Sequence, residues 1–206
     1  MGLDSAGLRE LDSEGRCVIT DHQAFVLFNC YFPNVGGGDD NEQREQRFEY
    51  KMNFNRVVQA RCEALRRAGR HVVIAGDVNC IHREIDTCDM PRMLKMAGVT
   101  QEEFLQRPDR KWLHAMLVDG GGPMVDLFRN FYPDQPRAYT CWDTRTNARE
   151  TNYGTRIDYV LADKALVDLG PDGFWDCRIM REVHGSDHCP VVADAGGTVK
   201  KKNVGT

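Results

Sequence analysis

The stretch from His71 to Asp86 reads HVVIAGDVNCIHREID and sets the framework for the rest of the chain. Residues 72–75 form an apolar run, and Gly-Asp-Val-Asn follows it at once. Residues two apart in a strand point to the same face, so Asp77 and Asn79 are expected to converge at the carboxyl end of this strand. A carboxylate oxygen and an amide oxygen suit a hard cation such as Mg²⁺. An Asx turn that ends the strand is the alternative explanation for the same two residues.

The segments on either side predict a mixture of strands and helices. Upstream, residues 16–20 and 24–32 predict a β-hairpin, and apolar residues at helical spacing predict a helix over about 42–68 that ends at Gly69. Downstream, residues 87–99 are expected to form a loop. The sequence then predicts a helix that opens with the capping box Thr100–Glu103, a helix over 110–118, and strands over 138–142, 156–162, 174–180 and 190–195. Because several neighbouring strands look antiparallel, the expected class is α+β rather than a doubly wound parallel sheet.

The composition argues against several classes of protein. The chain has 206 residues, of which 41% are hydrophobic, and this fits a single globular domain. The net charge of −4 gives no global basic field for nucleic acid, although a local basic patch is compatible with it. No apolar run has the length of a membrane span, so no membrane partner is expected. The eight cysteines include no Cys-x-x-Cys pair, which predicts reduced thiols in a reducing compartment and no zinc framework.

Two further motifs place acids and a histidine where hydrolysis could use them. HGSDHCPVV puts Asp187 beside His188 in a polar loop, where a metal-binding carboxylate and an imidazole can reach one cleft, although an ordinary turn explains the motif equally. NYGTRIDYVLAD puts Asp158 inside an apolar strand, and a buried acid needs a partner. His188 is one candidate partner, with the carboxylate fixing the imidazole tautomer, and Arg156 is the other.

These motifs occur in the order GDVN, NYGTRIDYVLAD, GSDHCPVV, and CYFPN, IHREID and DLFRNFYPDQPRAYTCW accompany them. Over residues 12–194 the chain resembles the exonuclease III-like class II abasic-site endonucleases, within the wider endonuclease–exonuclease–phosphatase group. The resemblance implies an α+β fold that is part of a four-layer α/β/β/α sandwich of the DNase I type. It also implies a divalent metal cofactor, Mg²⁺ with Mn²⁺ as the alternative.

The resemblance assigns roles to residues of the matching motifs. It implies a catalytic set of Tyr31, Asp77, Asn79, Asp158 and His188, and metal ligands Asp77, Asn79, Asp187 and His188. The residues implied to bind substrate are Asn34, Asn147, Arg156, Cys141 and Thr155. Tyr31 would lie near the scissile phosphate, and Asp158 would orient His188. Whether Asp77 or His188 handles the proton of the attacking water stays open.

The implied function is metal-dependent hydrolysis of phosphodiester bonds in DNA at abasic sites and 3′ ends, as an AP endonuclease, 3′–5′ exonuclease and 3′-phosphodiesterase of base excision repair. The expected partner is double-stranded DNA with abasic sites or blocked 3′ ends, bound by a monomer in the nucleus. One alternative is another phosphodiesterase or phosphatase of the same superfamily. A second alternative is a non-catalytic, truncated DNA-binding remnant.

Two departures from the family pattern qualify these expectations. The N-terminal segment of the family, with its metal-binding glutamate, has no match before Cys17. The expected organisation is a polar segment over 1–15, the C-terminal two-thirds of the family domain over 16–195, and a basic tail over 196–206, and such a chain is expected to be a poor catalyst by itself. In addition, Cys141 and Thr155 stand where members specialised for incision carry aromatic residues, which is typical of a branch that favours 3′-end processing.

Overall fold

A mixed five-stranded sheet forms the centre of the molecule, as seen in a computed structural model that describes residues 4–36 and 40–196. The strands lie in the order β1 (Cys17–Asp21), β2 (Val26–Tyr31), β3 (Val72–Asp77), β7 (Asp158–Asp163) and β4 (Met124–Asp126). Strands β2 and β3 are parallel, and the other neighbours are antiparallel. The mixed sheet with helices on its outer side confirms the predicted α+β class.

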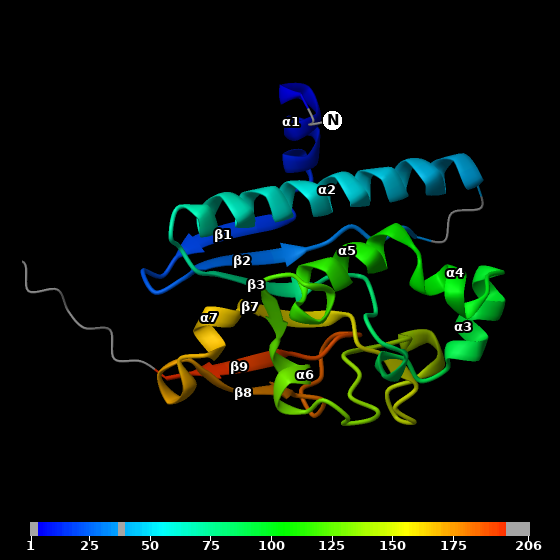
Figure 1. Ribbon diagram of the computed structural model, residues 1–206. Coiled ribbons are helices and arrows are strands. Elements are labelled where there is room, and N and C mark those ends of the chain that lie inside the picture. Colours follow the sequence, from blue (N-terminus) through cyan, green and yellow to red (C-terminus); the bar gives the residue numbers. More distant parts are fainter. Residues whose placement is uncertain (1–3, 37–39, 197–206) are drawn as a thin grey trace, which may run out of the picture.

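Helices cover one face of this sheet. Helix α2 (Asn41–Arg67) begins at Asp40, whose side chain accepts a hydrogen bond from the Glu42 backbone N–H, and it lies across the β1–β2 hairpin together with α5 (Pro108–Met116) (Figure 1). Apolar residues of both helices pack against the alternate residues of β2, β3 and β7 that point toward them. This buried layer supplies a rigid support on which the strand ends are held.

A smaller sheet covers part of the opposite face. Strands β8 (Phe174–Ile179) and β9 (Val191–Ala195) form an antiparallel pair, and α6 (Leu127–Phe131) lies beside them (Figure 1). Side chains of this layer, Phe174 and Cys177 among them, share a buried cluster with the residues of the central sheet that point away from α2. The observed layers are therefore helix, sheet and sheet, as expected for part of a four-layer sandwich.

The remaining elements are short. They are α1 (Ser5–Ser13), α3 (Met90–Ala97), α4 (Gln101–Leu105), α7 (Lys164–Val167), the two-stranded ribbon of β5 (Cys141–Trp142) and β6 (Gly154–Thr155), and four 3₁₀ turns: η1 (Glu84–Asp86), η2 (Val118–Gly120), η3 (Thr144–Thr146) and η4 (Gly170–Asp172). The capping box predicted at Thr100 and Glu103 opens α4, with both of its hydrogen bonds present. The strand expected over 138–142 is reduced to β5, and the rest of that segment is extended chain.

One segment differs from the prediction, and another contains a helix that the sequence analysis did not predict. Residues 87–99 contain α3 instead of a continuous loop, because Asp89 caps the Arg92 backbone N–H and Gly98 ends the helix in the left-handed conformation. The polar segment over 1–15 contains α1, capped by Asp4, and this helix buries Leu11 in the main core. The tail predicted over 196–206 lies, apart from Gly196, outside the described residues. Within the described ranges, no helix is long and apolar enough to cross a membrane.

The packing of strand β3 shows how an apolar strand can present a polar side chain at its carboxyl end. Val72 and Ile74 pack toward α2, whereas Val73 and Ala75 pack toward β8 and β9, and Asp77 continues this second face beyond the apolar layer. Gly76, just before Asp77, has a φ of 130°, and a Cβ there would lie 2.1 Å from the Cys30 carbonyl oxygen. Only glycine therefore allows β2 and β3 to approach this closely at the end of the sheet.

Candidate active site

Three predicted catalytic residues lie in one row across the end of the central sheet. Tyr31 of β2 pairs with Asp77 of β3, and Asp77 pairs with Asp158 of β7. Residues in register on neighbouring strands point to the same face, so the row forms a polar edge directly beyond the apolar layer. Tyr31 is 53% exposed, which places its ring on the surface at one end of the row.

His188 joins the other end of this row. Its Nδ1 lies 2.8 Å from Oδ2 of Asp158, so the partner of Asp158 is the histidine and not Arg156. The contact occupies Nδ1 and leaves Nε2 as the ring atom available to a ligand or substrate. A carboxylate thus fixes the orientation of the imidazole, as the sequence predicted for one of its two alternatives.

Asp77 and Asn79 meet through a turn and not through strand alternation. Strand β3 ends at Asp77, and Asn79 has a φ of 50°, in the left-handed region. The Asn79 backbone N–H donates to Asp77 Oδ1 at 2.7 Å, and its side-chain nitrogen donates to Asp77 Oδ2 at 2.8 Å and to the Phe32 carbonyl at 2.9 Å. The Asx-turn alternative and the predicted convergence of the two side chains are therefore both present. Lys51 of α2 donates to the Asn79 carbonyl at 2.6 Å and holds the turn from the side of that helix.

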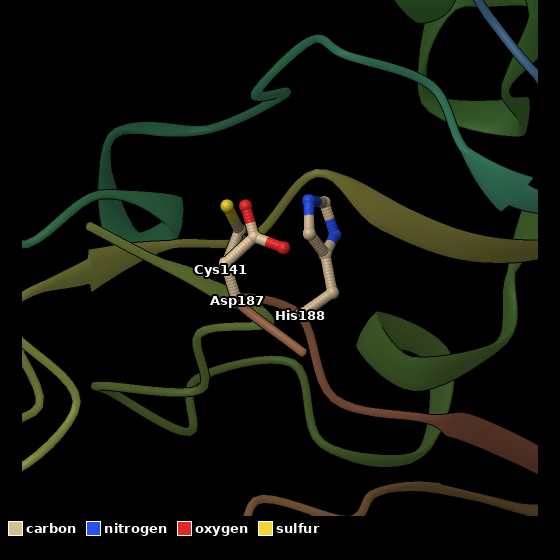
Figure 2. Close-up of side chains that lie close together, drawn as sticks. All are labelled: Cys141, Asp187 and His188. Carbon is tan, nitrogen blue, oxygen red and sulfur yellow. The ribbon is translucent and has the colours of Figure 1, made fainter. Parts of the chain in front are cut away.

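A short backbone ladder holds the loop that carries His188. The Trp142 N–H donates to the Asp187 carbonyl and the Cys189 N–H to the Thr140 carbonyl, both at 2.9 Å. Cys141 therefore forms an antiparallel bridge with His188. Figure 2 shows the result: the Cys141 sulfur lies beside the Asp187 carboxylate, and the His188 ring faces both.

Burial and neighbouring charges shift the pKa values of two members of the site. Burial, with the Asp158 carboxylate as a second cause, raises the pKa of Asp77 to about 6. The hydrogen bond to Asp158, followed by a contact with the Cys141 side chain, raises the pKa of His188 to about 11. The imidazolium form of His188 is thus stabilised, whereas Asp77 titrates close to neutral pH.

The oxygen donors at this end of the sheet suit a hard divalent cation. Asp187 presents an exposed carboxylate, and Asp77 supplies a second one on the strand next to Asp158. Asn79 directs its amide nitrogen at Asp77, which turns its amide oxygen away from that carboxylate. The predicted ligands do not form one tight cluster, however. Within the described part of the chain, the acids, histidines and cysteines that gather with ligand atoms within 4.8 Å of one another are Cys141, Asp187 and His188.

Four of the five predicted substrate-binding residues lie at or near the surface, and three of them lie beside this site. Cys141 and Thr155 are cross-strand partners in the β5–β6 ribbon. Asn147 has a φ of 51° and lines a cavity of about 620 Å³ that extends to Asp187. Asn34 is exposed in the loop that follows β2, and its side-chain oxygen accepts a hydrogen bond from the Gly36 N–H.

Arg156 occupies a different environment from the one predicted. Its side chain is 0% exposed, and its guanidinium forms hydrogen bonds with the carboxylates of Asp86 and Asp126 at 2.7–3.1 Å. A substrate cannot reach a buried side chain with these partners, so its position does not fit the predicted substrate-binding role. Its place in the structure is that of an internal ion-pair partner.

Three supporting residues were not found from the sequence. Lys51 fixes the Asn79 turn, and Thr140 accepts hydrogen bonds at its side-chain oxygen from the N–H groups of residues 157 and 158. Arg149 donates to carbonyl groups of the loop before His188. For Lys51, the sequence offered one signal, which is a lysine in a helix whose other side is apolar. The other two bind backbone groups, which leave no trace in a sequence pattern.

The sequence profile of the Endonuclease/Exonuclease/phosphatase family matches residues 3–188, and the chain belongs to this family. Members of this family are divalent-metal-dependent. DNA-(apurinic or apyrimidinic site) endonuclease 2 of Homo sapiens is 42% identical over 202 residues, which cover 90% of this chain and 36% of that protein. The protein of the same name from Schizosaccharomyces pombe is 39% identical over 196 residues, with coverages of 93% and 34%.

Among solved structures, the Xenopus laevis APE2 catalytic domain matches with a TM-score of 0.76 and 39% sequence identity. The match covers 96% of this chain and 62% of that one. The chain therefore resembles endonuclease 2 proteins in both sequence and fold, as predicted. It spans between 34% and 38% of the length of the curated relatives described by that name.

Proposed function

We propose that this chain carries a large part of the catalytic centre of a Mg²⁺-dependent nuclease that hydrolyses DNA phosphodiester bonds at abasic sites and 3′ ends. The observation that carries the proposal is the row of Tyr31, Asp77 and Asp158, with His188 bound to its end. The names of the relatives, which describe endonucleases for apurinic or apyrimidinic sites, support the substrate class. Hydrolysis of a phosphodiester bond needs charge neutralisation, an oriented base and a contact to the phosphate, and the proposed activity fits these needs.

In this proposal each residue has a separate task. The Asp187 carboxylate and the amide oxygen of Asn79 would hold Mg²⁺, which neutralises charge on the phosphate when it is bound. His188, kept as imidazolium by Asp158, would donate from Nε2 to a phosphate oxygen. Asp77, with a pKa raised to about 6, would accept the proton of the attacking water. This division of roles between Asp77 and His188 was open in the sequence.

The surroundings of the row support a DNA substrate. The cavity of about 620 Å³ adjoins Asp187, so a sugar or terminal nucleotide placed there would bring its phosphate to the metal ligands. The small side chains of Cys141 and Thr155 border the site and leave room for a 3′ end. We further propose that the protein acts as a monomer on double-stranded DNA in the nucleus, as part of base excision repair, and that Mn²⁺ can replace Mg²⁺.

The test uses a chimera, because the solved Xenopus laevis domain extends beyond the matched region. Residues 4–196 of this chain replace the matching segment of that domain, and the chimera is assayed on duplexes with an abasic-site analogue or a 3′ overhang, in Mg²⁺ and in EDTA. We expect Mg²⁺-dependent cleavage of both duplexes, and a loss of about 100-fold or more in the His188→Ala and Asp187→Ala variants.

A matched control replaces His22, an exposed histidine at the turn end of the β1–β2 hairpin and outside the lining of the cavity, with alanine, and should cut within a few-fold of the parent chimera. No cleavage by a folded chimera, or activity within about tenfold of the parent in the His188→Ala variant, would overturn the proposal. Cleavage of a phosphorylated lipid headgroup in preference to DNA would favour a sister phosphatase function.

A further inference from the structure

Cys141 adds a soft ligand to a site whose other donors are oxygen and nitrogen. Ligand atoms of Cys141, Asp187 and His188 all lie within 4.8 Å of one another, although the three residues come from two distant segments (Figure 2). A hard cation such as Mg²⁺ prefers oxygen ligands and binds a thiolate poorly. The combination of a sulfur, an imidazole nitrogen and a carboxylate oxygen is instead the donor set of zinc-class metals.

The geometry is close to that of a three-residue zinc site. Zinc holds sulfur at about 2.3 Å and nitrogen or oxygen at about 2.0–2.2 Å, so neighbouring ligand atoms in a tetrahedral site lie about 3.5 Å apart. Because the three ligand atoms lie within 4.8 Å of one another, they need to close by at most about 1.3 Å, which rotamer adjustments can supply since Cys141 and His188 are half-buried and Asp187 is exposed. The exposed Asp187 side leaves a fourth position open to solvent.

The histidine is also prepared for a metal. Asp158 occupies Nδ1 at 2.8 Å, so a metal would bind at Nε2 by displacing the proton there, and a carboxylate behind a histidine is the usual outer-shell partner of a zinc-bound imidazole. The backbone ladder between residues 140–142 and 187–189 fixes Cys141 opposite His188. The two ligands that come from distant segments are therefore held in register before any metal binds.

We propose that Cys141, Asp187 and His188 form a site for Zn²⁺ or a metal of similar softness, and that its occupation inhibits the enzyme. The bound ion would take Asp187 and His188 away from the hard cation and the phosphate. Binding releases the thiol proton of Cys141, and any proton on Nε2 of His188, to solvent. The inhibitory part rests on the proposed function, whereas the binding part rests on the cluster alone.

The binding test uses Co²⁺ as a spectroscopic substitute for zinc, with the 206-residue chain and a native circular dichroism spectrum as the requirement for each variant. We expect a cobalt–thiolate charge-transfer band that disappears on addition of Zn²⁺. Cys141→Ser should abolish the band and weaken zinc binding about tenfold or more, measured by competition with a chromophoric chelator. The matched control is Cys88→Ser, whose thiol is also half-buried but lies outside the cluster, and it should keep the band.

The inhibition test uses the chimera in saturating Mg²⁺, with each variant compared with its own zinc-free rate. The zinc concentration for half inhibition should rise about tenfold or more in Cys141→Ser and stay unchanged in Cys88→Ser. A cobalt band that survives Cys141→Ser, or the lack of any band in the native chain, would overturn the zinc site even if the chimera is an active nuclease. An inactive chimera with a normal cobalt band would instead refute the proposed nuclease function and leave the metal site standing.

Discussion

The single contact between Asp158 and His188 decides the protonation state of the histidine. The Asp158 carboxylate lies 2.8 Å from Nδ1 and is the first cause of the raised pKa of His188, from an ordinary value of 6.5 to about 11. Arg156, two residues earlier, does not compete for Asp158, because its guanidinium is held by Asp86 and Asp126. The raised pKa of His188 therefore depends mainly on this carboxylate, with the Cys141 contact as the second cause, and removing the carboxylate should reverse most of the shift.

We expect the Asp158→Asn variant to bring the pKa of His188 back to within about one unit of 6.5, because the amide keeps a hydrogen-bonding oxygen but loses the charge. The measurement is an NMR titration of the His188 imidazole in both proteins. Asp143→Asn, which removes an exposed carboxylate paired with Arg145, serves as the control and should leave His188 unchanged. A His188 that titrates near 6.5 in the native chain would contradict the assignment.

At the scale of an element, one side chain organises the loop that leads to His188. The Arg149 guanidinium lies 4.6 Å from the centre of the Trp142 ring and donates to the carbonyls of residues 181, 183 and 186 at 2.6–3.2 Å. The segment 180–188 has no helix or strand of its own, so these contacts replace the missing secondary structure. Arg149 is thus a positioning residue for Asp187 and His188.

The Arg149→Met variant keeps much of the stacking volume but removes the donors, and it should loosen this loop. We expect faster amide hydrogen exchange over residues 181–188 and a loss of about 1–3 kcal/mol in unfolding free energy, because the carbonyls lose their partners. In the chimera kcat should fall more than KM changes. Arg145→Met, at an exposed arginine nearby, is the control. Unchanged exchange over this loop would show that the backbone ladder alone holds it.

At the scale of single elements, the sequence was sufficient to predict several features of the fold. The apolar run of β3, the capping box of α4 and the ends of α2 are encoded in windows of a few residues, and they were predicted. Helix α3 was missed although Met90, Met93, Leu94 and Ala97 stand at helical spacing between the N-cap Asp89 and Gly98. Arg156 as the alternative partner of Asp158 was an inference from strand alternation, which does not extend back to it because β7 begins at Asp158. The pairing of Cys141 with His188 depends on register between distant segments, which no local pattern contains.

At the scale of the whole molecule, a buried ion-pair network ties separate segments together. Asp86 follows the β3 turn, Asp126 ends β4, Arg129 belongs to α6, and Arg156 precedes β7. Burial alone would raise the pKa of Asp86, but the Arg156 and Arg129 guanidiniums outweigh it and lower that pKa to about 2. A carboxyl with a lowered folded-state pKa stabilises the fold above its unfolded pKa, and this contribution disappears as the pH falls toward the folded value.

We therefore expect Asp86→Asn to cost about 3–5 kcal/mol at neutral pH, since it leaves two buried guanidiniums without their shared partner. The difference from the native chain should shrink as the pH falls from about 4 to about 2, where Asp86 itself becomes protonated. Urea unfolding over a series of pH values measures both effects. The control is Asp21→Asn, because the pKa of Asp21 is also lowered to about 2 but the group is fully exposed. Equal stabilities of the Asp86→Asn and Asp21→Asn variants at pH 7 would contradict the expectation.

The close approach of β2 and β3 at Gly76 has a consequence for reading genetic variation in this protein. Any side chain there would collide with the Cys30 carbonyl and force apart the strands that carry Tyr31 and Asp77. In a mutational survey scored only by the proposed nuclease activity, a substitution at Gly76 would be as damaging as one at a catalytic side chain, although glycine has no reactive atom. Scoring the amount of folded protein in parallel would separate the two kinds of position, and a missense allele at Gly76 would be classed by its loss of abundance.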